Sequence, residues 1–168
     1  MIVGWFSKGI EGLPEGLFVV LIATILYVIY TFQFVRWFPG LFVKLQLVSW
    51  SKDIKPLLWR KLGVSPLFEE LIFRLGFLFV PIQIFSNSAP LPIFTAVVWS
   101  SVIFGYMHGG FKKVPLQGVS GLILSVVFLK CGGWNGDFFI ATCVSVTAHS
   151  LINGGIYLWA LREGYIMH

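Results

Sequence analysis

Two adjacent glutamates, Glu69 and Glu70, lie inside an apolar stretch of the sequence, and Arg74 follows them. A charged side chain at the centre of a bilayer helix costs about 2.5–3.5 kcal/mol on insertion scales. Residues at i and i+4 lie on one face of a helix, so Glu70 and Arg74 can pair. A carboxylate in such a place can act as the general base that activates a water. Because packing alone gives no reason to place three ionisable groups there, we expect this segment to carry chemistry.

Two further pairs of residues have the same spacing. Phe104 and His108 stand four residues apart, and so do His149 and Asn153. An imidazole beside a carboxylate can help to activate a water. A second imidazole and an amide can donate hydrogen bonds to an oxyanion that develops on a carbonyl substrate. Together with the glutamate pair, these residue types predict a hydrolytic site.

The composition indicates that these residues lie in a membrane protein. The chain has 168 residues, of which 57% are hydrophobic and 11% charged, whereas soluble domains carry about 25% charged residues. We therefore expect an all-α, polytopic helical membrane bundle that forms one domain over residues 1–168. The net charge of +5 is explained by basic cytoplasmic loops. Nucleic-acid binding is not expected, because no soluble segment interleaves basic residues with stacking aromatics.

The expected spans follow from the apolar runs, since an α-helical span needs about 20 mostly apolar residues. Five segments are expected to span the membrane: residues 17–34, 65–85, 93–107, 114–129 and 137–161. Residues 37–50 are flanked by tryptophans and interrupted by Pro39 and Gly40, which favours an interfacial or re-entrant helix. We assign residues 37–61 to this helix and a basic cytoplasmic loop. About five to six transmembrane helices result, and the last four form a catalytic core over residues 65–161.

The basic residues orient the predicted bundle. Most of them lie within residues 36–61, at 112–113 and at Arg162, and cytoplasmic loops concentrate such residues. The amino terminus is therefore expected outside and the carboxyl terminus in the cytoplasm. With a rise of about 1.5 Å per residue, the two glutamates, His108, His149 and Asn153 all reach the cytoplasmic half of the bundle. Residues from three segments can thus meet at one depth.

The three motifs, Glu-Glu-x-x-x-Arg, Phe-x-x-x-His and His-x-x-x-Asn, occur in order on successive apolar segments. In this the chain resembles the CPBP family, which includes CAAX proteases, bacteriocin-processing proteases and Abi proteins. The resemblance covers residues 65–161 and implies a glutamic-type intramembrane endopeptidase that needs no cofactor. It also implies one role for each motif residue: Glu69 as the base that activates water, His108 as its helper, His149 and Asn153 as the oxyanion site, Glu70 and Arg74 as a supporting pair, and Phe104 as packing.

Three alternatives stay open at this point. Glu69, His108 and His149 could instead be zinc ligands by residue type, although the absence of His-Glu-x-x-His favours the metal-free reading. The protein could also be a non-catalytic immunity or scaffold protein of the same fold. The intact set of motif residues argues against this, because such a protein need not keep them. A haem or metal electron-transfer protein with His108 and His149 as axial ligands would leave the glutamates unexplained.

The expected partners are the lipid bilayer and a membrane-embedded or lipid-attached peptide substrate. The resemblance allows three substrate classes: prenylated tails, bacteriocin or pheromone precursors, and carboxy-terminal sorting tails of exported proteins. The compact chain, rich in Phe and Trp, favours the inner membrane of a bacterium as its location.

Overall fold

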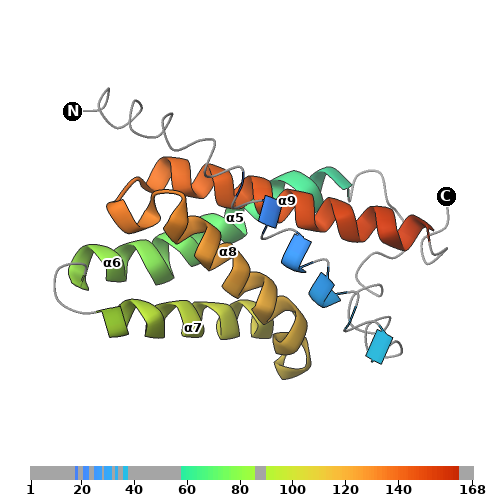
Figure 1. Cartoon of the computed structure of the whole chain (residues 1–168), viewed down its shortest axis with the longest axis horizontal. Helices are drawn as coiled ribbons and strands as arrows, with labels where there is room; N and C mark the ends of the chain where they lie inside the picture. The colour runs from blue at the N-terminus through green and yellow to red at the C-terminus, as the bar shows by residue number, and fades with distance from the viewer. Residues whose placement is uncertain are drawn as a thin grey trace.

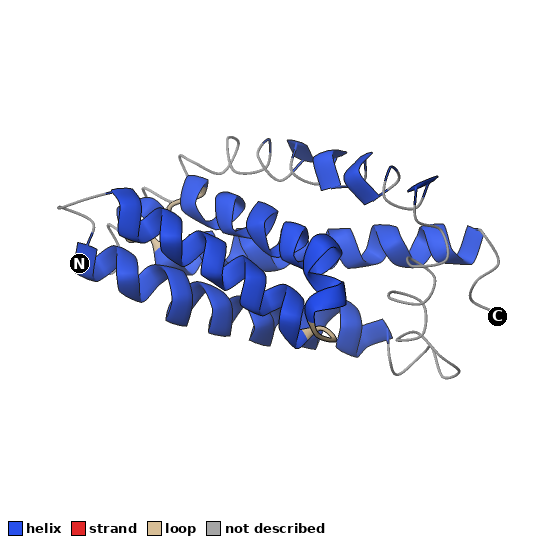
Figure 2. Ribbon diagram, turned by 90° about the horizontal axis from the view of Figure 1, so that it is seen from below, coloured by secondary structure: helices blue, strands red, loops and turns tan. Residues whose placement is uncertain are grey.

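The computed structural model describes residues 58–85 and 90–162, together with residues 18, 21, 22, 25–27, 29–31, 33, 36 and 37. Every regular element among these residues is a helix, and they contain no strand (Figure 2). This confirms the all-α prediction. The expected interfacial helix at 37–50, apart from Trp37, and residues 51–57 of the basic loop lie outside the described residues. The described positions of the expected first span are helical.

The long helical stretches coincide with the four expected core spans. The first stretch contains η2 (Arg60–Val64), α5 (Ser65–Glu70), η3 (Leu71–Phe79) and α6 (Val80–Phe85), and the second is α7 (Pro90–Met107). The third contains η4 (Phe111–Lys113), η5 (Val114–Gly118) and α8 (Val119–Lys130). After a short 3₁₀ turn, η6 (Gly133–Asn135), the fourth is α9 (Phe138–Arg162).

The first stretch begins earlier than the sequence suggested. Residues 58–61 are helical, whereas we expected them to belong to the basic loop, so that boundary is corrected. Lysine, arginine and leucine all favour helices. Leu62 also packs against α9, since a Cβ added at Gly154 would stand 3.9 Å from its side chain. Intrinsic preference and a tertiary contact together extend the helix through the basic residues.

Two parts of this first stretch, η2 and η3, are π-helical. The amide of Val80 donates to the carbonyl of Leu75, five residues earlier, which is the π-helical bond. Such wide turns are rare and are found frequently at functional sites. The wider turn of η3 begins directly after Glu70 and contains Arg74.

Figure 1 shows α8 running between α7 and α9, with α5 beside α9. Two buried apolar clusters hold these helices together. One joins the first stretch, α7, α8 and α9 through Leu78, Ile82, Ile93, Val97, Phe128 and Ala141. The other packs Tyr27, from the amino-terminal part, on α8 and α9 through Leu124, Val127, Ala148 and Ile152. The polar cluster described below lies between these helices.

Two of the helices are long and apolar enough to cross a membrane, Phe111–Lys130 and Phe138–Trp159, and Leu91–Met107 is apolar but shorter. The first stretch carries five charged residues: Arg60, Lys61, Glu69, Glu70 and Arg74. The apolar helices are consistent with a helical membrane protein. The total of five to six spans stays a prediction.

Helix α7 approaches η5 so closely at Gly105 that no side chain fits. A Cβ added at Gly105 would stand 2.7 Å from Cα of Val114 and 2.8 Å from the amide nitrogen of Gly118. Small residues allow membrane helices this kind of contact. Because both neighbours are backbone atoms, only a movement of the helices could make room.

We predict that Gly105→Ala lowers the free energy of unfolding by about 1–3 kcal/mol, the usual cost of overpacking. The measurement is thermal unfolding of the purified protein in detergent micelles. Gly76→Ala is the matched control, because a Cβ at Gly76 meets nothing within 4 Å. A Gly105→Ala protein as stable as the Gly76→Ala protein would show that the two helices do not meet at this contact.

Candidate active site

Glu70 and Arg74 form a buried ion pair at the centre of the bundle. Both side chains are fully shielded from solvent, and Nε of Arg74 donates to Oε2 of Glu70 at 2.7 Å. Nη2 of Arg74 also donates to Oε1 of Glu70 at 3.4 Å. The predicted pairing of these two residues is thus confirmed, and its cause is the spacing of four residues within one helical segment.

The remaining N–H groups of Arg74 reach two other parts of the bundle. Nη1 donates to Oγ of Ser125 at 2.9 Å and, at 3.5 Å, to Oγ of Ser100. Nη2 donates to the carbonyl of Gly121 at 3.4 Å. All five guanidinium hydrogens are therefore directed at acceptors on the first stretch, α7 and α8. A buried guanidinium satisfied in this way holds three helices in one arrangement.

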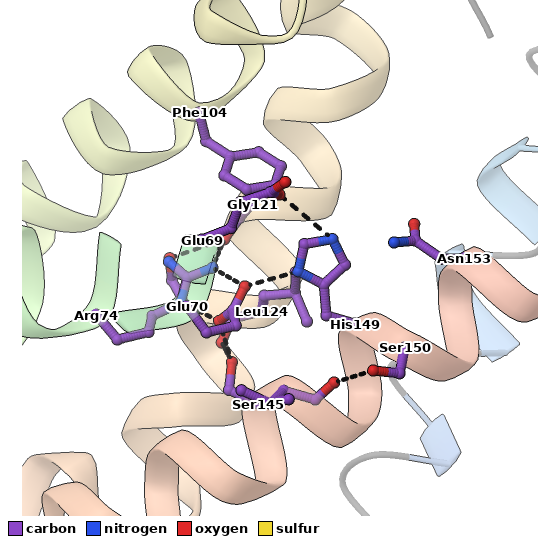
Figure 3. Close-up of polar contacts among 12 residues, drawn as sticks. Glu69, Glu70, Arg74, Phe104, Gly121, Leu124, Ser145, His149, Ser150 and Asn153 are labelled. Carbon is purple, nitrogen blue, oxygen red and sulfur yellow. Dashed lines mark hydrogen bonds and ion pairs between the residues drawn. The ribbon is translucent and has the colours of Figure 1, made fainter. Parts of the chain in front are cut away.

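Helix α9 joins the same ion pair through His149, whose side chain is 5% exposed. Nδ1 of His149 lies 3.0 Å from Oε1 of Glu70. A carboxylate that already accepts from Arg74 takes a hydrogen bond but cannot donate one, so Nδ1 carries the proton. The second ring nitrogen, Nε2, then points away from Glu70 toward Glu69, as the close-up in Figure 3 shows.

Glu69 sits at the edge of this cluster, with 25% of its side chain exposed. Its Oε2 atom is shielded from solvent yet accepts no hydrogen bond from any described residue. Nε2 of His108 lies 3.4 Å from this oxygen and Nε2 of His149 lies 3.7 Å from it. The two adjacent glutamates therefore have different surroundings: one is fully satisfied and the other has an oxygen that lacks a donor.

His108 is fixed by the end of α7. Its Nδ1 lies 2.7 Å from the carbonyl of Phe104, and a carbonyl can only accept, so Nδ1 carries the proton here as well. The helix ends there because Gly109 and Gly110 adopt φ values of 137° and 81°, which glycine reaches without strain. In the neutral ring, Nε2 of His108 then faces Glu69 as the nitrogen with the lone pair.

Three acceptor atoms accordingly converge on one place: Oε2 of Glu69 and the Nε2 atoms of His108 and His149. Acceptors this close need a shared donor, which either a proton on one of the imidazoles or a water beside the three atoms supplies. These atoms are also of the types that bind zinc. Among the described residues, however, no group of three His, Cys, Asp or Glu side chains is arranged as a metal cluster.

Phe104 packs against both imidazoles and is itself completely buried. Its ring centre lies 4.4 Å from that of His108 and 5.8 Å from that of His149. On its other side it meets Phe73 edge-on, with ring centres 5.0 Å apart. The ring closes the apolar side of the cluster and limits the movement of both histidines, which agrees with the packing role expected for it.

Asn153 lies one turn beyond His149 on α9, and its amide points to the same side of the helix (Figure 3). Its Nδ2 donates to the carbonyl of Lys61 at 3.1 Å. That carbonyl belongs to the π turn before Pro66, and proline has no N–H to offer it. One amide hydrogen therefore ties α9 to the first stretch, and the other can still serve the predicted oxyanion site.

The structure brings six predicted residues into one cluster and adds others that sequence reasoning missed. The predicted members are Glu69, Glu70, Arg74, Phe104, His108 and His149, with Asn153 bonded to Lys61 beside them. The missed members are Ser100, Ser125, Ser145 and the carbonyl of Gly121. Of these, only Ser145 had a visible signal, since it precedes His149 by four residues.

The described residues form an all-helical bundle with membrane-length apolar helices and a buried carboxylate–imidazole cluster, features consistent with a membrane protein. Residues 51–155 match the family described as type II CAAX prenyl endopeptidase Rce1-like. Because this match covers more than half of the chain, the protein belongs to the Rce1-like family, whose members are membrane-embedded proteases. The resemblance inferred from the three motifs is confirmed. Comparison with curated proteins found no match, and neither did comparison with solved structures.

We predict that Arg74→Met destabilises the protein by about 3–5 kcal/mol, because it leaves Glu70 as an uncompensated buried charge. The double variant Glu70→Gln/Arg74→Met removes both charges and should recover part of that loss. Unfolding of both variants in detergent measures the difference. A double variant no more stable than Arg74→Met would contradict the ion pair as the main contribution of Arg74.

Proposed function

We propose that this protein is an intramembrane endopeptidase that cleaves a peptide bond of a membrane-associated substrate with a water activated by Glu69. The observation that carries the proposal is the orientation of both imidazoles. Their Nδ1 hydrogens are used by Glu70 and by the carbonyl of Phe104, so both Nε2 atoms face the unsatisfied oxygen of Glu69. This arrangement suits a single water beside the cluster that donates to Oε2 of Glu69 and to Nε2 of His108.

In the proposed reaction, the water gives a proton to Oε2 of Glu69 while its oxygen attacks the carbonyl carbon of the scissile bond. His108 orients the water from Nε2. The proton on Glu69 then passes to the leaving nitrogen as the C–N bond breaks. Glu70 takes no proton in this scheme, because both of its oxygens already accept hydrogen bonds.

The oxyanion would be stabilised by donors next to the attacked carbonyl. Asn153 can supply the amide hydrogen that Lys61 does not use. His149 can donate from Nε2 only when both of its ring nitrogens carry protons, since Nδ1 is engaged by Glu70. Because Nε2 of His149 serves as an acceptor in the proposed water site, we assign the oxyanion donor to Asn153.

For the substrate, we propose a peptide presented from the membrane, either prenylated or carrying an apolar tail. The family description supports a prenylated peptide as the first to test, and a carboxy-terminal sorting tail is the second. We further propose that the protein lies in a bacterial inner membrane, with the His108 end of the bundle toward the cytoplasm. The basic residues at that end, such as Lys61 and Lys113, support this orientation.

We predict that Glu69→Gln abolishes cleavage of these two peptides by the protein in lipid vesicles, because an amide cannot accept the proton of the water. Folding should be kept, since the exposed edge of the cluster tolerates a neutral side chain of the same shape. Mass spectrometry of the peptide products and the thermal unfolding midpoint measure the two effects. Full cleavage by Glu69→Gln would end the catalytic assignment and favour a scaffold role.

The metal-free mechanism has its own test. We expect wild-type cleavage to persist after exhaustive treatment with a zinc chelator, and we expect less than one zinc per protein by elemental analysis. Loss of activity on chelation that returns with added zinc would instead assign Glu69, His108 and His149 as ligands.

A further inference from the structure

Ser145 is a fully buried serine on α9, one turn before His149. Its hydroxyl donates a short hydrogen bond to Oε2 of Glu70. The same hydroxyl lies 3.4 Å from the carbonyl of Leu124 on α8. None of the three sequence motifs includes this residue, so its position calls for a separate explanation.

Other hydroxyls in the bundle behave differently. In a helix, serine and threonine commonly donate back to the carbonyl four residues earlier. Five described residues do so: Thr95, Ser101, Ser125, Thr147 and Ser150. Ser145 instead turns its hydroxyl away from its own helix and toward the carboxylate of another.

The two oxygens of Glu70 accept hydrogen bonds from different sets of donors. Oε2 accepts from Ser145 and from Nε of Arg74 at 2.7 Å. Oε1 accepts from Nδ1 of His149 at 3.0 Å and, at 3.4 Å, from Nη2 of Arg74. Because donors on two different helices hold Oε2, the carboxylate cannot rotate freely about its own axis. Oε1 is consequently held where it fixes the hydrogen of His149 on Nδ1.

We propose that Ser145 is a positioning residue that acts through Glu70 to keep His149 with its hydrogen on Nδ1 and its Nε2 toward Glu69. The assignment rests on the proposed function for its effect on catalysis, whereas its effect on the imidazole stands independently. Removing the residue that orients a metal-ligating histidine typically costs about 10–100-fold in affinity or activity, and we expect an effect of the same order here.

The test compares Ser145→Ala, Ser145→Cys and Ser145→Thr with Ser150→Ala as the matched control. Ser150 lies on the same helix but donates only to the carbonyl of Val146. Steady-state cleavage separates kcat from KM. Nitrogen NMR of protein labelled with ¹⁵N-histidine reports which ring nitrogen carries the hydrogen. The chain has only three histidines, so the His149 signals can be assigned from the His149→Gln spectrum.

We expect Ser145→Ala to lower kcat on the order of tenfold with KM unchanged, and to populate the form of His149 protonated on Nε2. Ser145→Thr, which keeps the hydroxyl, should restore both properties, and Ser150→Ala should match wild type. If Ser145→Ala does not fold, Ser145→Cys, of similar volume but with a weak donor, decides in its place. A loss of kcat without a change at His149 would overturn the proposal, as would wild-type values for both.

These outcomes separate the two proposals. If wild type cleaves no substrate, the proposed function fails, yet the NMR comparison still supports or rejects the role of Ser145. If wild type cleaves and Ser145→Ala is unchanged in both readouts, the proposed function stands and the positioning role is lost.

Discussion

The buried ion pair between Glu70 and Arg74 is the interaction on which the rest of the structure depends. Two charges removed from water are tolerated only when their remaining hydrogen-bonding groups are also satisfied. Here those groups are satisfied by side chains and backbone from α7, α8 and α9. Any sliding of one helix against another would leave part of the pair without a partner. The pair therefore fixes the positions of the four helices, and the catalytic geometry follows from it.

The ion pair also explains why two neighbouring glutamates can differ so much. Successive residues on a helix point in different directions, so burying Glu70 places Glu69 at the edge of the cluster. The carboxylate of Glu70 is used in the ion pair that holds the helices together, while Oε2 of Glu69 accepts no hydrogen bond from any residue that the structure describes. A general base needs an oxygen that is free to accept the proton of a water. In this bundle Arg74, Ser145 and His149 all bond to Glu70, which leaves that oxygen on Glu69.

Much of the site could be predicted from the sequence because charged residues in apolar helices are costly and therefore informative. The spacing of four residues paired Glu70 with Arg74 correctly, and the depth argument brought Glu69 and His108 together. The four core helices also followed from apolar length. Ser100 and Ser125 could not be singled out, since a serine in a helix usually donates to its own helix. The spacing of Ser145 from His149 was visible, but only the packing shows that its hydroxyl reaches Glu70.

Backbone features escaped prediction for a different reason. The early helical start goes with a contact between Leu62 and α9, and in the π segment η2 one carbonyl loses its usual donor to a proline. The bond from Asn153 to Lys61 exists because proline at position 66 withholds an N–H. A carbonyl of this kind lacks a donor because a proline stands where an N–H would otherwise be. The sequence shows the proline, but it does not show which carbonyl would have accepted the missing hydrogen.

The end of α7 shows that Phe104 contributes to the Phe-x-x-x-His motif with its backbone carbonyl as well as its ring. Position 104 contributes a ring, which must be aromatic, and a carbonyl, which any residue would provide. That carbonyl is available to His108 only because the helix stops there, and it stops because Gly109 and Gly110 turn the chain. The functional unit is therefore longer than the motif and includes two residues with no side chain. Relatives that keep the histidine but lose this turn would present a different ring nitrogen to the glutamate that corresponds to Glu69.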